Sequence, residues 1–163
     1  MKNDVDETLR QQAQALVKAE TKYLNDTDLD NWIALFTENG YYWMPLEEAH
    51  QNPEMHDSLI YDNRDLMQMR KYNLGNPLSP SMQHKIRSVR ILSDLEISDP
   101  NKENDQIKVD ASVIAVISHK QQNYYAGKVQ YLLEMENGQL KIQSKRVDLL
   151  NADAPLDVIM MYI

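Results

Sequence analysis

The side chains best suited to chemistry lie in the middle of the sequence: Tyr61, Asp62, Arg64, His84 and Arg87. An aspartate and a histidine near a tyrosine can act as base, acid and oxyanion donor in a concave site. Two of these residues also have a structural explanation, because Asp62 can cap a helix and His84 stands at the polar start of a strand. No spacing here is diagnostic of catalysis, so we favour the structural roles and keep the catalytic trio Tyr61, Asp62 and His84 as the alternative.

A second polar group, a loop at 47–57, contains His50, His56 and four acidic residues, Glu47, Glu48, Glu54 and Asp57. These are ligand types that suit a divalent metal. A spacing of six residues in a loop does not preorganise a site, and acidic loops are commonly just solvated. We therefore expect no metal site in this chain.

The composition excludes several classes of function. The chain of 163 residues has no cysteine, which rules out disulfides, thiolate catalysis and cysteine-ligated iron–sulfur clusters. Its net charge of −8 repels nucleic acids and anionic membranes. No apolar run resembles a signal peptide or a membrane span. We expect a single domain over 1–163, in the cytoplasm, with no nucleic-acid or membrane partner and no cofactor of its own.

Periodicity predicts helices first and strands later. Helices are expected at 6–25, 29–36 and 62–72, the last capped by Asp62 with Leu66, Met69 and Tyr72 or Asn73 facing inward. Strands are expected at 40–44 and 85–98, with Val89, Ile91, Leu95 and Ile97 on the apolar side. A final strand at 156–163 is apolar on both faces, so it should be central in the sheet or covered by another chain.

Between them, 106–150 reads as a meander of three strands. Asn137 and Gly138 suit a two-residue hairpin turn, which would pair Glu136 with Gln139. An unbroken register would then place Ser144, Arg146 and Asp148 on the inner face. We favour a bulge that turns Val147 and Leu149 inward instead, because unpaired charges inside a core are costly. The whole layout predicts an α+β fold, in which N-terminal helices close a curved antiparallel sheet into a cone with a pocket.

The sequence resembles the small (beta) subunit of aromatic-ring-hydroxylating dioxygenases, which are Rieske non-heme iron oxygenases. The similarity extends over nearly the whole chain and is carried by short segments in a specific order: 19–20, 23–25, 32–36, 42–45, 58–64 with Leu66 and Arg70, His84, 126–128, Leu132, 140–142, 145–147, 149–151, 156–157 and 162–163. Tyr131 and the segment 149–151 are most similar to the benzoate, toluate and anthranilate branch.

The resemblance implies the cone fold of nuclear transport factor 2 and ketosteroid isomerase. It also implies a partner, a large alpha subunit that carries the Rieske 2Fe-2S cluster and the mononuclear iron, in an alpha3beta3 hexamer supplied with electrons by a reductase or ferredoxin. The complex would add dioxygen to an aromatic ring, with an aromatic carboxylate favoured as substrate. The beta subunit would then be structural, and Arg87, Arg146 and Asp148 become candidates for interior or interface ion pairs.

Two other functions are open at this point. One is a stand-alone cone-fold isomerase or dehydratase that uses Tyr61, Asp62 and His84, which requires these side chains to converge inside the cone. The other is a ligand-binding or dimerising module without a reaction.

Overall fold

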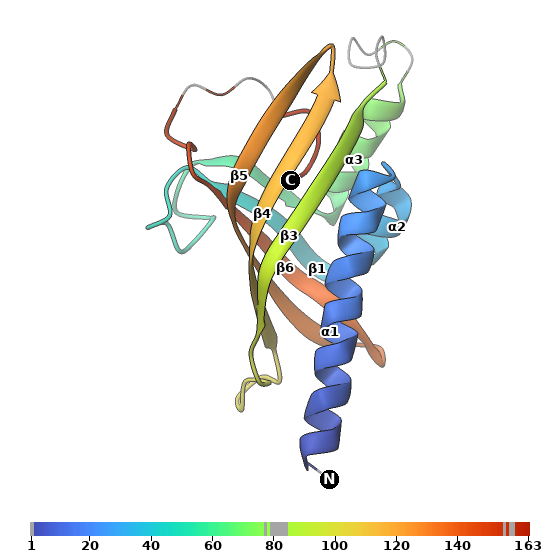
Figure 1. Ribbon diagram of the computed structural model, residues 1–163, viewed down its shortest axis with the longest axis vertical. Helices are drawn as coiled ribbons and strands as arrows, with labels where there is room; N and C mark the ends of the chain where they lie inside the picture. The colour runs from blue at the N-terminus through green and yellow to red at the C-terminus, as the bar shows by residue number, and fades with distance from the viewer. Residues whose placement is uncertain (1, 77, 79–84, 155, 157–158) are drawn as a thin grey trace.

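The computed structural model describes residues 2–76, 78, 85–154, 156 and 159–163. Its elements follow the order α1 (Lys2–Asn25), α2 (Leu29–Ala34), β1 (Phe36–Pro45), β2 (Ser58–Asn63), α3 (Arg64–Gly75), β3 (Arg87–Ile97), β4 (Ile107–His119), β5 (Gln121–Glu136) and β6 (Gln139–Leu149) (Figure 1). The predicted α+β fold class is confirmed.

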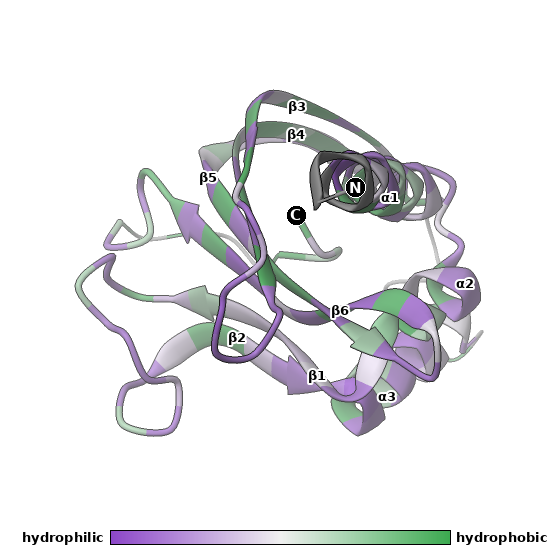
Figure 2. Ribbon diagram, turned by 90° about the horizontal axis from the view of Figure 1, so that it is seen from below, coloured by the Kyte–Doolittle hydropathy of each residue, from purple (hydrophilic) through white to green (hydrophobic). Residues whose placement is uncertain are grey.

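The strands form one sheet in the order β2-β1-β6-β5-β4-β3. Neighbours are antiparallel except β1 and β6, which run parallel. Seen from below, the sheet curls around a central space that α1 closes beside β3 and β4, while α2 and α3 lie near β1 (Figure 2). Aliphatic and aromatic side chains from both the helices and the sheet fill this space and form the core. This is the cone of the nuclear transport factor 2 fold.

The meander agrees with the sequence in detail. Asn137 and Gly138 both have positive φ angles, 51° and 79°, and Glu136 pairs with Gln139 as the two-residue turn requires. Leu133 pairs with Ile142 but Leu132 pairs with Ser144, so β6 carries one extra residue at Gln143. The predicted bulge is therefore present. Beyond it Val147 and Leu149 are buried, 0% and 6% exposed.

The segment 58–63 corrects one sequence prediction. It forms β2, paired with β1, so residues 62 and 63 end a strand instead of starting the helix predicted at 62–72. The N-cap of α3 is Asn63, whose side-chain oxygen accepts a hydrogen bond from Leu66 N at 3.0 Å. Asp62 is in β2 and faces the core, so it is not the cap.

Two predicted faces are also wrong, one in part and one throughout. In β3, Leu95 and Ile97 pack against the core as predicted. Before the register shift between Ser93 and Glu96 the alternation is inverted, so Val89 and Ile91 are 50% and 64% exposed and Arg90 is buried. In α3, the predicted inner residues Leu66, Met69 and Tyr72 are exposed, and Met67 is the buried one. The error in β3 comes from the extra residue at the register shift, and the error in α3 comes from assigning apolar residues to the core by their type alone.

The end of the chain does not form the predicted strand in the residues that the structure describes, 156 and 159–163. Instead, Met161, Tyr162 and Ile163 are at most 1% exposed. Figure 2 shows the C-terminal end in the space that the sheet encloses. The apolar character on both faces of this segment therefore reflects burial inside the cone.

Candidate functional site

A buried ionic cluster lies where α1 meets the inner face of the sheet. Glu20 Oε1 accepts hydrogen bonds from Lys145 Nζ at 2.5 Å and Trp32 Nε1 at 2.8 Å. Glu20 Oε2 accepts one from Tyr131 OH at 3.0 Å. Glu20 and Lys145 are 0% and 2% exposed, and the Lys145 ammonium also lies 5.8 Å from the ring centroid of Tyr42. Both carboxylate oxygens thus have partners.

Burial dominates the electrostatics of this cluster. It lowers the pKa of Lys145 from its usual value, against the attraction of Glu20. It raises the pKa of Tyr131 well above its usual value, and the neighbouring Glu20 carboxylate acts in the same direction. Burial also raises the pKa of Tyr42. Tyr131 and Tyr42 are therefore neutral hydrogen-bonding groups near pH 7, and neither is activated as a base.

A second interior group joins β2 and α3 to the end of the chain. Tyr162 OH donates to Asp62 Oδ2 at 2.6 Å, and Arg70 Nε donates to the same carboxylate oxygen at 2.8 Å. Arg70 Nη2 donates to Asp62 Oδ1 at 3.2 Å, so the guanidinium holds both oxygens. The Asp62 side chain is only 7% exposed. This geometry fixes residue 162 inside the cone.

The buried Arg90 of β3 strengthens the same attachment. Its Nε donates to the carbonyl oxygen of Tyr162 at 3.1 Å, and its Nη2 donates to that oxygen as well. Nη1 donates to Asn25 Oδ1 and Ser88 Oγ at 3.2 and 2.8 Å. Burial lowers the pKa of Arg90 from its usual value. Arg90 links the end of α1, β3 and the C-terminal residues.

The alternative catalytic trio is not assembled in the described part of the chain. Tyr61 and Asp62 are adjacent in β2, so their side chains point to opposite faces of the sheet. Asp62 faces the core, while Tyr61 is 38% exposed and packs edge-on against Tyr41, with ring centroids 5.5 Å apart. His84 lies outside the described residues. Arg64 donates to the carbonyl oxygen of Phe36 at 3.4 Å.

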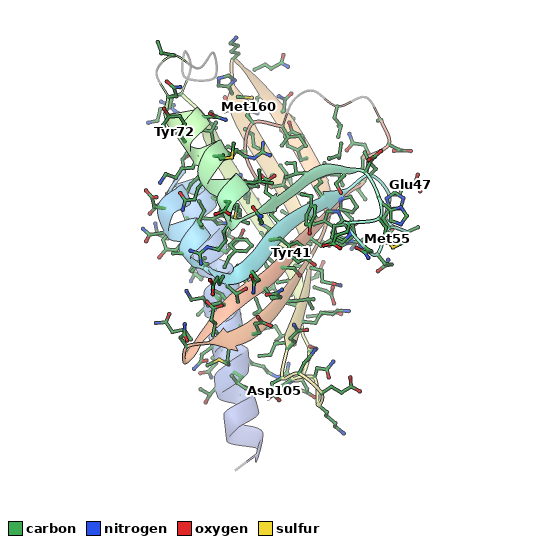
Figure 3. The ribbon with its side chains drawn as sticks, turned by 180° about the vertical axis from the view of Figure 1, so that it is seen from behind. Tyr41, Glu47, Met55, Tyr72, Asp105 and Met160 are labelled. Carbon is green, nitrogen blue, oxygen red and sulfur yellow. The ribbon has the colours of Figure 1, made fainter. Side chains whose placement is uncertain are left out.

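Of the three candidates for ion pairs, Arg146 and Asp148 pair with each other on the outer face of the sheet, and Arg87 does not join them. Arg146 Nε donates to Asp148 Oδ2 at 2.8 Å, and Nη2 donates to Oδ1 at 2.9 Å. The Arg146 guanidinium lies 4.6 Å from the ring centroid of Trp43, a cation–π distance. Arg87, at the start of β3, is exposed. Figure 3 shows Tyr41 on this side, on β1 beside β6.

The loop at 47–57 brings its two histidines together. The rings of His50 and His56 stack in parallel with centroids 4.0 Å apart, and His50 Nε2 is 3.8 Å from Glu47 Oε2. Glu47 and Met55 mark this loop at the edge of the molecule in Figure 3. Among the described residues, no group of three or more histidine, aspartate or glutamate side chains could hold a metal ion.

Reasoning from the residues alone missed Glu20 and Lys145. A signal for Glu20 was available, because it follows Leu16 by four positions and Val17 by three and so shares their apolar helical face. A charged residue in that stripe must be paired if it is buried. Lys145 gave no such signal, because the bulge at Gln143 decides whether it points inward.

Among the described residues, no helix is long and apolar enough to cross a membrane.

Comparison with known proteins supports the resemblance seen in the sequence. The chain is 28% identical over 141 residues to the small oxygenase component of the p-cumate 2,3-dioxygenase system of Pseudomonas putida, covering 84% of this chain and 77% of that protein. It is 23% identical over 146 residues to the beta subunit of benzoate 1,2-dioxygenase of Acinetobacter baylyi, covering 86% of both.

Solved structures share the fold. The beta subunit of benzoate 1,2-dioxygenase from Burkholderia mallei superimposes with a TM-score of 0.70 at 24% identity, over 92% of this chain and 95% of that one. Naphthalene 1,2-dioxygenase with bound indole gives a TM-score of 0.77 at 16% identity, over 97% and 87%. The family model of the ring hydroxylating beta subunit matches residues 19–154. This chain therefore belongs to the ring hydroxylating beta subunit family.

Proposed function

We propose that this chain is the noncatalytic beta subunit of a multicomponent dioxygenase that adds dioxygen to an aromatic ring during the catabolism of aromatic compounds. Family membership supports the assignment. Relatives from p-cumate and benzoate dioxygenases, whose names denote aromatic carboxylates, favour a substrate of that class. The site of dioxygen addition lies on another subunit.

The observation that carries the noncatalytic role is that Glu20 is fully buried with both carboxylate oxygens hydrogen-bonded. A general base needs a free lone pair within reach of the substrate. Glu20 accepts from Lys145, Trp32 and Tyr131 and is 0% exposed. The carboxylate of Asp62 is likewise held by Arg70 and Tyr162. These arrangements favour interior groups that hold the cone together.

The metal-ligating side chains of this chain do not match the ligands that the cofactors of the complex need. A Rieske cluster needs two cysteine ligands, and the sequence contains no cysteine. Mononuclear non-heme iron needs two histidines and a carboxylate, a set that the described residues do not assemble. We therefore assign both cofactors to a large alpha subunit and propose an alpha3beta3 complex, supplied with electrons by a reductase or ferredoxin.

Exposed apolar residues on the outer face support a partner. Val89 and Ile91 in β3, Ile114 in β4 and Tyr124 in β5 are between 50% and 68% exposed. Ile91 pairs with Ile114, and Val116, two residues further along β4, pairs with both Val89 and Tyr124, so the four exposed residues form one continuous row across the three strands. Apolar surface of this kind is typical of contacts with another protein. We assign the row, together with Arg87, Arg146 and Asp148, to contacts with the large subunit.

Coexpression with a large oxygenase subunit from the same genome tests the proposal. We expect one complex with equal numbers of the two chains, measured by size-exclusion chromatography with light scattering. Ile114→Asp should weaken that complex, whereas Met55→Asp, a matched change at an exposed site on the loop at 47–57, should leave it intact. A small subunit that stays separate from the large one in every preparation would refute the proposal.

A further inference from the structure

The ring of Tyr162 is surrounded as a bound aromatic ligand would be. Trp32 stacks on one face, with centroids 4.4 Å apart and planes at 24°. Tyr42 meets it edge-on at 4.8 Å and 62°, and the Arg70 guanidinium carbon lies 5.4 Å from the ring centroid. Stacking, edge contact and a cation at one ring are the main ways in which proteins recognise aromatic rings.

The hydroxyl group of Tyr162 is recognised just as completely. It donates to Asp62 Oδ2 at 2.6 Å and accepts from Arg70 Nε at 3.2 Å. One donor and one acceptor match the hydrogen-bonding capacity of a neutral phenol. Burial, together with the hydrogen bond to Asp62, raises the pKa of Tyr162, which shows that these surroundings disfavour the phenolate.

The walls of this site are independent of the residue that fills it. Trp32 comes from α2, Tyr42 from β1, Asp62 from β2 and Arg70 from α3. Tyr162 lies far from all of them in sequence, on a segment that is neither helix nor strand. Rigid elements thus form the site, and the last residues of the described chain deliver the phenol into it.

We propose that the cone interior contains a binding site for a neutral phenol, and that the chain occupies this site with its own Tyr162. Tethering gives the side chain a high effective concentration, so free phenols are excluded from the wild-type protein. The site becomes accessible only when residues 161–163 withdraw. The Arg70 side chain, 35% exposed, places the hydroxyl end of the site close to solvent.

Replacement of the tyrosine tests the proposal. Tyr162→Ala removes the atoms of one phenol, and binding of phenol and benzene to this full-length variant is measured by calorimetry at pH 7. We expect phenol to bind at least about tenfold more tightly than benzene, because only phenol can bond to the Asp62 carboxylate. Tyr162→Phe is the matched control: its ring fills the site, so it should bind neither compound, like the wild type.

The proposal is overturned if Tyr162→Ala binds phenol and benzene with equal affinity, or if it binds neither. It is also overturned if Tyr162→Phe binds phenol as tightly as Tyr162→Ala does. If Tyr162→Ala does not fold, the same comparison is made by refolding it with each compound and following its circular dichroism. Recovery with phenol but not with benzene supports the site. The proposal is overturned if a saturating concentration of phenol does not restore the folded state, or if benzene restores it equally well.

Discussion

Glu20 and Lys145, 125 positions apart in the sequence, form an ion pair in the core, with 2.5 Å between Oε1 and Nζ. Their side chains are 1% and 3% exposed, so neither charge is solvated by water. The pair joins α1 to β6 across the interior of the cone. Removing one partner leaves the other buried and uncompensated.

We therefore predict that Lys145→Met lowers the free energy of unfolding by about 3–5 kcal/mol. Glu20→Gln combined with Lys145→Met should cost less than Lys145→Met alone, because in the double variant neither member of the pair carries a charge. Urea denaturation measures both. Lys108→Met provides the control, since Lys108 pairs with Asp110 on the surface and its loss should cost about 0–1 kcal/mol. Equal effects at the two lysines would contradict the assigned role.

Alkaline pH should destabilise the protein. The pKa values of Tyr42, Tyr131 and Tyr162 are raised by burial, so the folded chain keeps these protons where the unfolded chain releases them, above about pH 10. The unfolded state then binds fewer protons, and stability falls as pH rises. The lowered pKa values of Lys145 and Arg90 act in the opposite direction, but they are two groups against three.

The matched variant is Tyr162→Phe, which removes one of the three hydroxyls. Between pH 10 and 12 its free energy of unfolding should fall less steeply than that of the wild type, by about 1.4 kcal/mol per pH unit for the missing proton. Urea midpoints at several pH values provide the measurement. Parallel slopes would mean that Tyr162 is not buried in solution.

Gly127 should tolerate no side chain. A Cβ atom there would lie 2.2 Å from the backbone oxygen of Asp148 in β6, and a backbone atom in a central strand cannot move aside cheaply. We predict that Gly127→Ala costs about 1–3 kcal/mol, measured by thermal or urea unfolding. Gly75→Ala is the control, because nothing lies within 4 Å of its Cβ position. A neutral Gly127→Ala would show that β5 and β6 pair differently.

The meander could be predicted from the sequence because its signals are local. Alternating residues and the Asn137-Gly138 turn set the pairing, and the polar row at Ser144, Arg146 and Asp148 indicated the bulge. The face of α3 and the exposed half of β3 could not be predicted, since exposed apolar residues such as Ile91 show the same pattern as buried ones. The position of Tyr162 depends on contacts with five distant elements, which no local pattern encodes.

The central claim is that this chain contributes structure and another subunit performs the reaction. Its most direct test is the turnover number of the reconstituted complex containing Glu20→Gln and Lys145→Met together, per assembled complex confirmed by mass. We predict a turnover number within about twofold of the wild type, with lower thermal stability, because no transition-state interaction is lost. A fully assembled complex whose turnover falls a hundredfold or more would contradict the claim and place chemistry inside the cone.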